Sequence, residues 1–144
     1  MNFNDCIKFA KEHPLCYLAT MDGDQPHVRG FLLWYADETG FYFHTADSKS
    51  VFKQLKVNPR LEVCFFVPER YPDLGIMLRV AGKVKFIEDT QVKVRLLEER
   101  PFLQEMAGGP DDPKLSVFQI HTGSAYFWRI ENNLKESEVE KIKF

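Results

Sequence analysis

The spacing of apolar residues along the chain changes several times, and each change predicts an element. Phe3, Cys6, Ile7 and Ala10 recur at helical intervals, which predicts an amphipathic helix over residues 4–13. Segments rich in aromatic and β-branched residues follow, separated by short turn signals such as DETG, and they predict strands. The first five of these strands cover residues 15–21, 27–35, 41–45, 60–67 and 76–86.

Helical spacing returns twice between the strands. Val51, Phe52 and Leu55 predict a helix over residues 48–55, with Ser48 in position to cap it. A further helix is predicted over residues 89–100, followed by an irregular stretch that contains the dipeptide Gly108-Gly109.

The end of the chain is predicted to form a hairpin and a tail. Residues 115–121 and 125–130 read as strands, and the turn signal Thr122-Gly123-Ser124 lies between them. Residues 132–144 form a charged tail that is compatible with a helix. In the fifth strand, Gly82 predicts a β-bulge or a close approach of two backbones.

Short antiparallel strands interrupted by helices predict a mainly β fold with flanking helices. An open sheet of this size would leave edge strands exposed, so the pattern favours an antiparallel barrel. The chain has 144 residues and no shift in composition, which predicts a single domain over residues 1–144.

Composition narrows the possible partners and the compartment. The formal net charge of −2 gives no global field toward nucleic acid or anionic lipid, so we expect neither a nucleic-acid nor a membrane partner. Three widely spaced cysteines, Cys6, Cys16 and Cys64, fit buried thiols better than a disulfide framework. The first residues lack the apolar core of a signal peptide, which leads us to expect a cytoplasmic protein. Four scattered histidines show no metal-ligand spacing.

One segment combines basic and hydroxyl residues at a strand-to-helix junction. Thr45, Ser48, Lys49 and Ser50 lie where the third strand meets the second helix. The first N–H groups of a helix have no intrahelical partners, and they attract anions. Arg29, if it points to the same place, adds a fork suited to phosphate. The alternative is that Ser48 only caps the helix, Lys49 is solvated and Arg29 pairs with a surface carboxylate.

A succession of motifs resembles the pyridoxamine 5'-phosphate oxidase-like family of FMN-binding split barrels. The motifs are DGDQPHVR, FHT, KSVFKQLKVNP, RVAGKV and the terminal VFQIHTGSAYFW. The resemblance covers most of the chain, and it implies a six-stranded antiparallel split β-barrel. It further implies a homodimer that holds two FMN molecules between its subunits.

The resemblance also implies roles for individual residues. The phosphate and ribityl chain of FMN are expected at the anion junction, with the first helical turn around them. The segment from Gly30 to Leu32 is expected to pass along the flavin ring, and the last strand to approach it from the partner subunit. The candidate cofactor residues are therefore Arg29, Gly30, Phe31, Leu32, His44, Thr45, Ser48, Lys49, Ser50, Val51, Tyr126, Phe127 and Trp128.

Three functions are compatible with these residues. The first is an FMN-dependent oxidoreductase that acts on a small molecule, with NAD(P)H as a candidate electron donor. The second is a flavin-binding or flavin-carrying module without turnover. The third is a heme-binding relative with His44 or His121 as axial ligand. Oxidation of pyridoxamine phosphate itself is not favoured, because Arg129 is the only basic residue beside the terminal aromatics.

Overall fold

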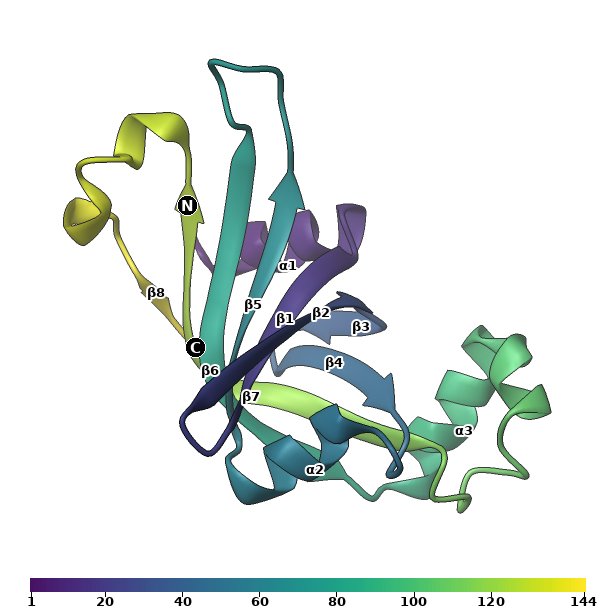
Figure 1. Cartoon of the computed structure of the whole chain (residues 1–144). Helices are drawn as coiled ribbons and strands as arrows, with labels where there is room; N and C mark the ends of the chain where they lie inside the picture. Colours follow the sequence, from purple (N-terminus) through teal and green to yellow (C-terminus); the bar gives the residue numbers. More distant parts are fainter.

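Eight antiparallel strands form one curled sheet in the computed structural model, which describes residues 1–144 (Figure 1). The strand order along the sheet is β2-β1-β5-β6-β7-β4-β3, and β8 pairs with β7. The strands are β1 (Leu15–Asp22), β2 (Gln25–Leu32), β3 (Tyr35–Asp37), β4 (Gly40–Thr45), β5 (Arg60–Val67), β6 (Ile76–Ile87), β7 (Ser116–Trp128) and β8 (Ile142–Lys143). Because β3 and β8 are very short, six longer strands carry the sheet, in agreement with the predicted split barrel.

Three α-helices and three short 3₁₀ helices flank the sheet. They are α1 (Phe3–Glu12), α2 (Ser50–Val57), α3 (Thr90–Glu99) and the 3₁₀ segments Pro101–Glu105, Ile130–Asn132 and Glu136–Glu138. None of these helices combines the length and hydropathy needed to cross a membrane. Figure 1 shows α2 near the turn between β1 and β2, and α3 at the far end of β4 and β7.

Helix α1 forms because its first turn is capped and one of its faces is apolar. Asn2 and Asp5 make a reciprocal capping box. Cys6 and Ala10 are fully buried, and the ring of Phe9 meets Phe127 edge-on at 5.4 Å. The helix therefore covers the inner face of the sheet near the end of β7.

Strand alternation divides the residues into an interior and an outer face. On β1, Leu18 is fully buried, whereas the neighbouring Tyr17 is 57% exposed. The interior is rich in aromatic rings, and Phe43 stacks on Phe118 at 5.4 Å. A second, smaller apolar cluster lies under α3 and includes Leu96. These two clusters leave little free volume inside the barrel for a cofactor.

The predicted terminal hairpin is wrong, because residues 116–128 form one continuous strand. Gly123 lies in the middle of β7 and pairs with Gly82 of β6. A Cβ atom on Gly123 would collide with the carbonyl oxygen of Ala81, and one on Gly82 with that of Thr122. The glycines therefore permit a close approach of two strands, as predicted for Gly82, and the bulge lies one residue later, between Lys83 and Val84.

Two other boundaries differ from the prediction. The strand predicted over residues 27–35 divides after Leu32, because the next two amides bond to different partners: Leu33 to Pro14 and Trp34 to Tyr42. The tail over residues 132–144 is not an α-helix, since it contains the 3₁₀ turn Glu136–Glu138 and then β8.

Helix α2 begins later than predicted. Lys49 occupies the N-cap position, so Ser48 does not cap the helix, and no side chain bonds to the first-turn amides. The next helix, α3, has Asp89 as its cap, and Asp89 Oδ1 accepts from the Gln91 amide at 2.8 Å.

Candidate functional site

Arg29 on β2 is half-buried and has no carboxylate partner. Its Nη1 donates to Thr20 Oγ1 at 2.7 Å and its Nη2 to Gln54 Oε1 at 2.9 Å. Thr20 Oγ1 in turn donates to the same Gln54 oxygen at 2.5 Å. Nη1 also donates to the carbonyl oxygens of Leu18 and His27, each at 3.3 Å. The Nε–H and one Nη2 N–H have no acceptor within the chain. The guanidinium thus keeps a free edge suited to bidentate binding of an anion.

A pocket of about 310 Å³ lies beside this arginine network. It is lined by the turn between β1 and β2 and by one face of α2, including Ser50, Lys53 and Gln54. Gln54 belongs to both the pocket wall and the Arg29 network. The positive groups Arg29 and Lys53 therefore flank the first turns of α2, where the helix dipole also favours an anion.

Thr45 ends β4 just before this helix. It is only 4% exposed, and its Oγ1 is a buried hydroxyl without a hydrogen-bond partner. A buried polar atom without a partner costs free energy, so its presence at this junction favours a partner that the isolated chain does not supply.

His44 points to the opposite face of β4 from Thr45, as strand alternation predicts. Its Nε2 accepts from Arg100 Nη1 at 2.8 Å, and Arg100 Nη2 donates to the Leu33 carbonyl at 2.8 Å. Burial, with the nearby charges of Arg100 and Lys49, lowers the pKa of His44 to about 4. The ring is therefore neutral at pH 7, with its proton on Nδ1.

The remaining α2 candidates divide into exposed and buried residues. Ser48, Lys49 and Ser50 are exposed around the start of the helix, where their polar groups can reach a ligand. Val51 is 3% exposed and belongs to the barrel core. Only its backbone N–H is available to a ligand.

The three other candidates on β2 alternate between the two faces of the sheet. Phe31 points inward and meets Phe43 edge-on at 5.8 Å. Gly30 and Leu32 belong to the outer face, and no atom lies within 4 Å of a Cβ built on Gly30. The outer side of this strand is therefore open.

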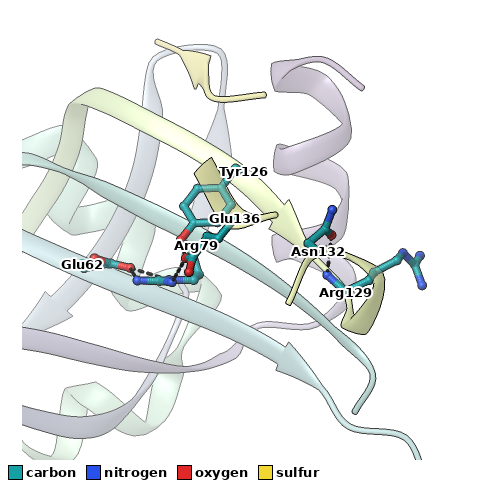
Figure 2. A network of polar contacts seen from close by, with 6 residues as sticks. All are labelled: Glu62, Arg79, Tyr126, Arg129, Asn132 and Glu136. Atoms are coloured by element: carbon teal, nitrogen blue, oxygen red, sulfur yellow. Dashed lines mark hydrogen bonds and ion pairs between the residues drawn. The ribbon is translucent and has the colours of Figure 1, made fainter. Parts of the chain in front are cut away.

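The terminal aromatic candidates are covered within the chain. Phe127 packs on α1, and Trp128 is 7% exposed. Figure 2 shows Tyr126 beside Arg79 and Glu136, and Tyr126 Oη donates to Glu136 Oε1 at 2.9 Å. Burial and this carboxylate raise the pKa of Tyr126 to about 12. Trp128 therefore presents little of its ring to solvent, whereas Phe127 remains partly exposed.

The Thr45 junction and the terminal aromatic candidates lie at opposite ends of β7. Ser116, the first residue of β7, pairs with Thr45, and Trp128 is the last residue of that strand. The 13 residues of β7 correspond to about 40 Å measured along the strand at the usual rise per residue. One chain therefore does not bring the Thr45 junction and the terminal aromatics to one small ligand.

Sequence reasoning gave no role to four residues that surround the junction. They are Thr20, Lys53, Gln54 and Arg100. Gln54 is part of the KSVFKQLKVNP motif, so the motif contained a signal for it. Arg100 lies 56 residues from His44, and no local pattern links them.

Comparison with known proteins identifies the family and the fold of this chain. Residues 5–129 match the model of the pyridoxamine 5'-phosphate oxidase family. A pyridoxine/pyridoxamine 5'-phosphate oxidase from Pseudomonas paraeruginosa is 34% identical over 106 residues, which are 68% of this chain and 47% of that protein. The chain thus spans about half the length of this curated relative.

Solved structures share the fold over nearly the whole chain. A NimC/NimA family protein from Clostridium acetobutylicum has a TM-score of 0.77 and 28% identity, covering 98% of this chain and 92% of its own. HutZ, a heme storage protein from Vibrio cholerae, has a TM-score of 0.65 and 17% identity, covering 89% of this chain and 94% of its own. With the family model matched over residues 5–129, the chain belongs to the pyridoxamine 5'-phosphate oxidase family.

Proposed function

We propose that this chain binds FMN at the Thr45 junction and uses it in the oxidation or reduction of a small molecule. The observation that carries the proposal is the buried Thr45 hydroxyl, which has no partner within the chain. It lies at the start of the segment that leads into α2, whose first turn is rich in polar groups. When bound, FMN supplies the redox chemistry, and the protein supplies position and electrostatics.

Arg29 and the first turns of α2 are the groups proposed to hold the phosphate. The free edge of the Arg29 guanidinium matches the geometry of phosphate oxygens. Lys49 and Lys53 add positive charge around Ser50. The Thr45 hydroxyl would then donate to, or accept from, the ribityl chain.

A second copy of the chain is proposed to complete the site. The outer face of β1 and β2 carries the exposed apolar side chains Leu15, Tyr17, Val28 and Leu32. Leu15 pairs with Leu32, and Tyr17 pairs with Gly30, so these residues form one surface. A flavin ring needs burial on both faces, and a two-fold dimer through this surface would cover the open side of Gly30.

Thr45→Val tests the proposal, because valine keeps the shape of threonine and removes the hydroxyl. The cofactor-free variant should be more stable than the wild type by about 1 kcal/mol or more, since an unpartnered buried hydroxyl is removed. Its FMN affinity should fall by at least about fivefold. Urea denaturation and fluorescence titration with FMN measure the two effects.

Arg29→Lys provides the second arm. A lysine keeps the positive charge and lacks the paired N–H donors of the guanidinium. The dissociation constant for FMN should therefore rise, while that for riboflavin stays the same. If Thr45→Val raises stability and both variants bind FMN like the wild type, the proposal is wrong. A Soret band in the purified protein would instead favour the heme-binding alternative.

Turnover is tested on the FMN-loaded protein. NADH or NADPH added without oxygen should bleach the flavin absorbance, and air should restore it. Absence of bleaching with both donors would leave the flavin-carrying alternative. The heme alternative is not favoured for His44, because Arg100 already donates to its Nε2.

A further inference from the structure

A groove opens on the outer face of the sheet where β5, β6, β7 and β8 meet. Its volume is about 680 Å³, compared with about 310 Å³ for the pocket beside Arg29. The polar side chains in its wall are Arg60, Lys83, Thr122, Ser124 and Lys143. We refer to it as the β6–β7 groove. Its size lies within the usual range for small-molecule sites.

Three positive side chains line this groove, and no acidic side chain belongs to its wall. Arg60 and Lys83 are directly opposite each other on β5 and β6. Like charges in this position destabilise a sheet. Lys143 on β8 pairs with Ser124 and adds a third charge. None of the three has a carboxylate within 4.0 Å.

The acidic residues nearest to the groove along the sheet are already occupied. Glu62 lies two residues from Arg60 and accepts from Arg79 Nε at 2.6 Å and from Arg79 Nη2 at 2.5 Å. Glu136 accepts from Arg79 Nη1 at 2.8 Å and from Tyr126. Figure 2 shows Arg79 between these two carboxylates. The network thus keeps both acids away from Arg60 and Lys83, whose charges remain uncompensated.

The floor and walls of the groove also suit an anion. Gly82 and Gly123 pair in its floor, where the backbones of β6 and β7 approach closely. The Ser124 hydroxyl has no hydrogen-bond partner within the chain, whereas Thr122 Oγ1 donates to the Phe144 carbonyl at 3.2 Å. Phe144 also lines the groove, and a backbone carboxylate at this residue would offset only one of the three positive charges.

We infer that the β6–β7 groove binds a small anion with at least two negative charges, of the phosphate type. An arginine fork, two ammonium groups and a free hydroxyl together donate enough hydrogen bonds for such a ligand. The overall charge of −2 and the confinement of these cations to one groove favour a small ligand over a nucleic acid. The groove shares no lining residue with the pocket beside Arg29, so the inference does not depend on FMN binding.

Calorimetric titration of the full chain with inorganic pyrophosphate tests this inference. At constant ionic strength, the wild type should show saturable binding of pyrophosphate. The double variant Arg60→Gln/Lys83→Gln should bind it at least about tenfold more weakly, because two charge-assisted partners are lost. Lys85→Gln is the matched control, since Lys85 is an exposed lysine on the same strand outside the groove. It should bind like the wild type.

Two further measurements distinguish binding in the groove from binding at α2 and from a loss of folding. Without pyrophosphate, the double variant should melt at or above the wild-type temperature, because a like-charge pair is removed. Lys49→Ala should retain pyrophosphate binding, since Lys49 lies at α2. The inference is overturned if the wild type shows no saturable binding. It is also overturned if Lys85→Gln weakens binding as much as the double variant, or if Lys49→Ala abolishes it.

Discussion

The guanidinium of Arg100 lies 2.8 Å from Nε2 of His44 and joins the end of α3 to β4. An arginine can only donate, so His44 must accept at Nε2 and remain neutral. The same guanidinium holds the Leu33 carbonyl, at the break between β2 and β3. One side chain therefore bonds both to His44 and to the segment of the chain that leaves β2.

The neutral His44 predicts a pH dependence of stability. Its pKa falls from 6.5 to about 4 on folding, chiefly through burial. Below pH 6.5, His44 therefore binds a proton in the unfolded chain, whereas in the folded chain it binds one only near pH 4. The stabilisation is complete above pH 6.5 and is lost as the pH falls, by about 3 kcal/mol in total.

Urea denaturation of the wild type and of His44→Gln between pH 7 and pH 4 measures this effect. Carboxylates titrate in the same range, so the prediction concerns the difference between the two slopes. The variant should lose less stability on acidification than the wild type. His27→Gln serves as the control, because His27 is exposed. Parallel curves for the wild type and His44→Gln would contradict the buried neutral imidazole.

The lysines of α2 predict a selective loss of FMN affinity. Lys49→Ala and Lys53→Ala should each weaken FMN binding by about 1–3 kcal/mol, because a phosphate loses a charge-assisted partner. Riboflavin lacks the phosphate and should bind both variants like the wild type. Fluorescence titration at fixed ionic strength measures the constants. Lys56→Ala is the control, since Lys56 Nζ lies 4.1 Å from the centre of the Phe86 ring, on the apolar side of the helix.

The outer face of β1 and β2 predicts the oligomeric state. Light scattering should report twice the chain mass of 16.8 kDa for the wild type. Tyr17→Asp and Val28→Asp should shift the protein toward the monomer and lower its FMN content, because charges do not pack in an apolar interface. Leu134→Asp should not, although Leu134 is 95% exposed, because it lies in the terminal segment outside that face. A monomeric wild type with full FMN occupancy would rule out the dimer.

Much of the fold follows from local pattern. Alternating burial along β1 and the capped apolar face of α1 are both readable in the sequence. The motifs around Arg29 and Thr45 predicted the anion junction, because charged residues occur there together with a change from strand spacing to helical spacing. These features depend on neighbours within a few residues, so the sequence alone contains them.

The features that escaped prediction depend on distant partners. Arg100 reaches His44 only after α3 folds back over β4. Phe127 contacts Phe9 of α1, and Trp128 is 7% exposed in the single chain; neither contact is indicated by the local sequence. The Gly123 segment reads locally as a turn, and only its pairing with Gly82 makes it the middle of a strand.

The two roles of glycine on this sheet predict opposite responses to alanine. At Gly123 a Cβ would collide with the backbone of β6, which cannot move without breaking the ladder. Gly123→Ala should therefore lower the free energy of unfolding by about 2–4 kcal/mol. At Gly30 a Cβ meets no atom within 4 Å, so Gly30→Ala should change stability by no more than about 0.5 kcal/mol. Urea midpoints of the cofactor-free variants measure both effects on stability, and a hairpin turn at Gly123 would instead tolerate alanine.

On titration with FMN, Gly30→Ala should bind more weakly than the wild type if the flavin passes close to β2. Equal affinities would place the flavin elsewhere, while the Gly123 result would still decide how β6 and β7 cross.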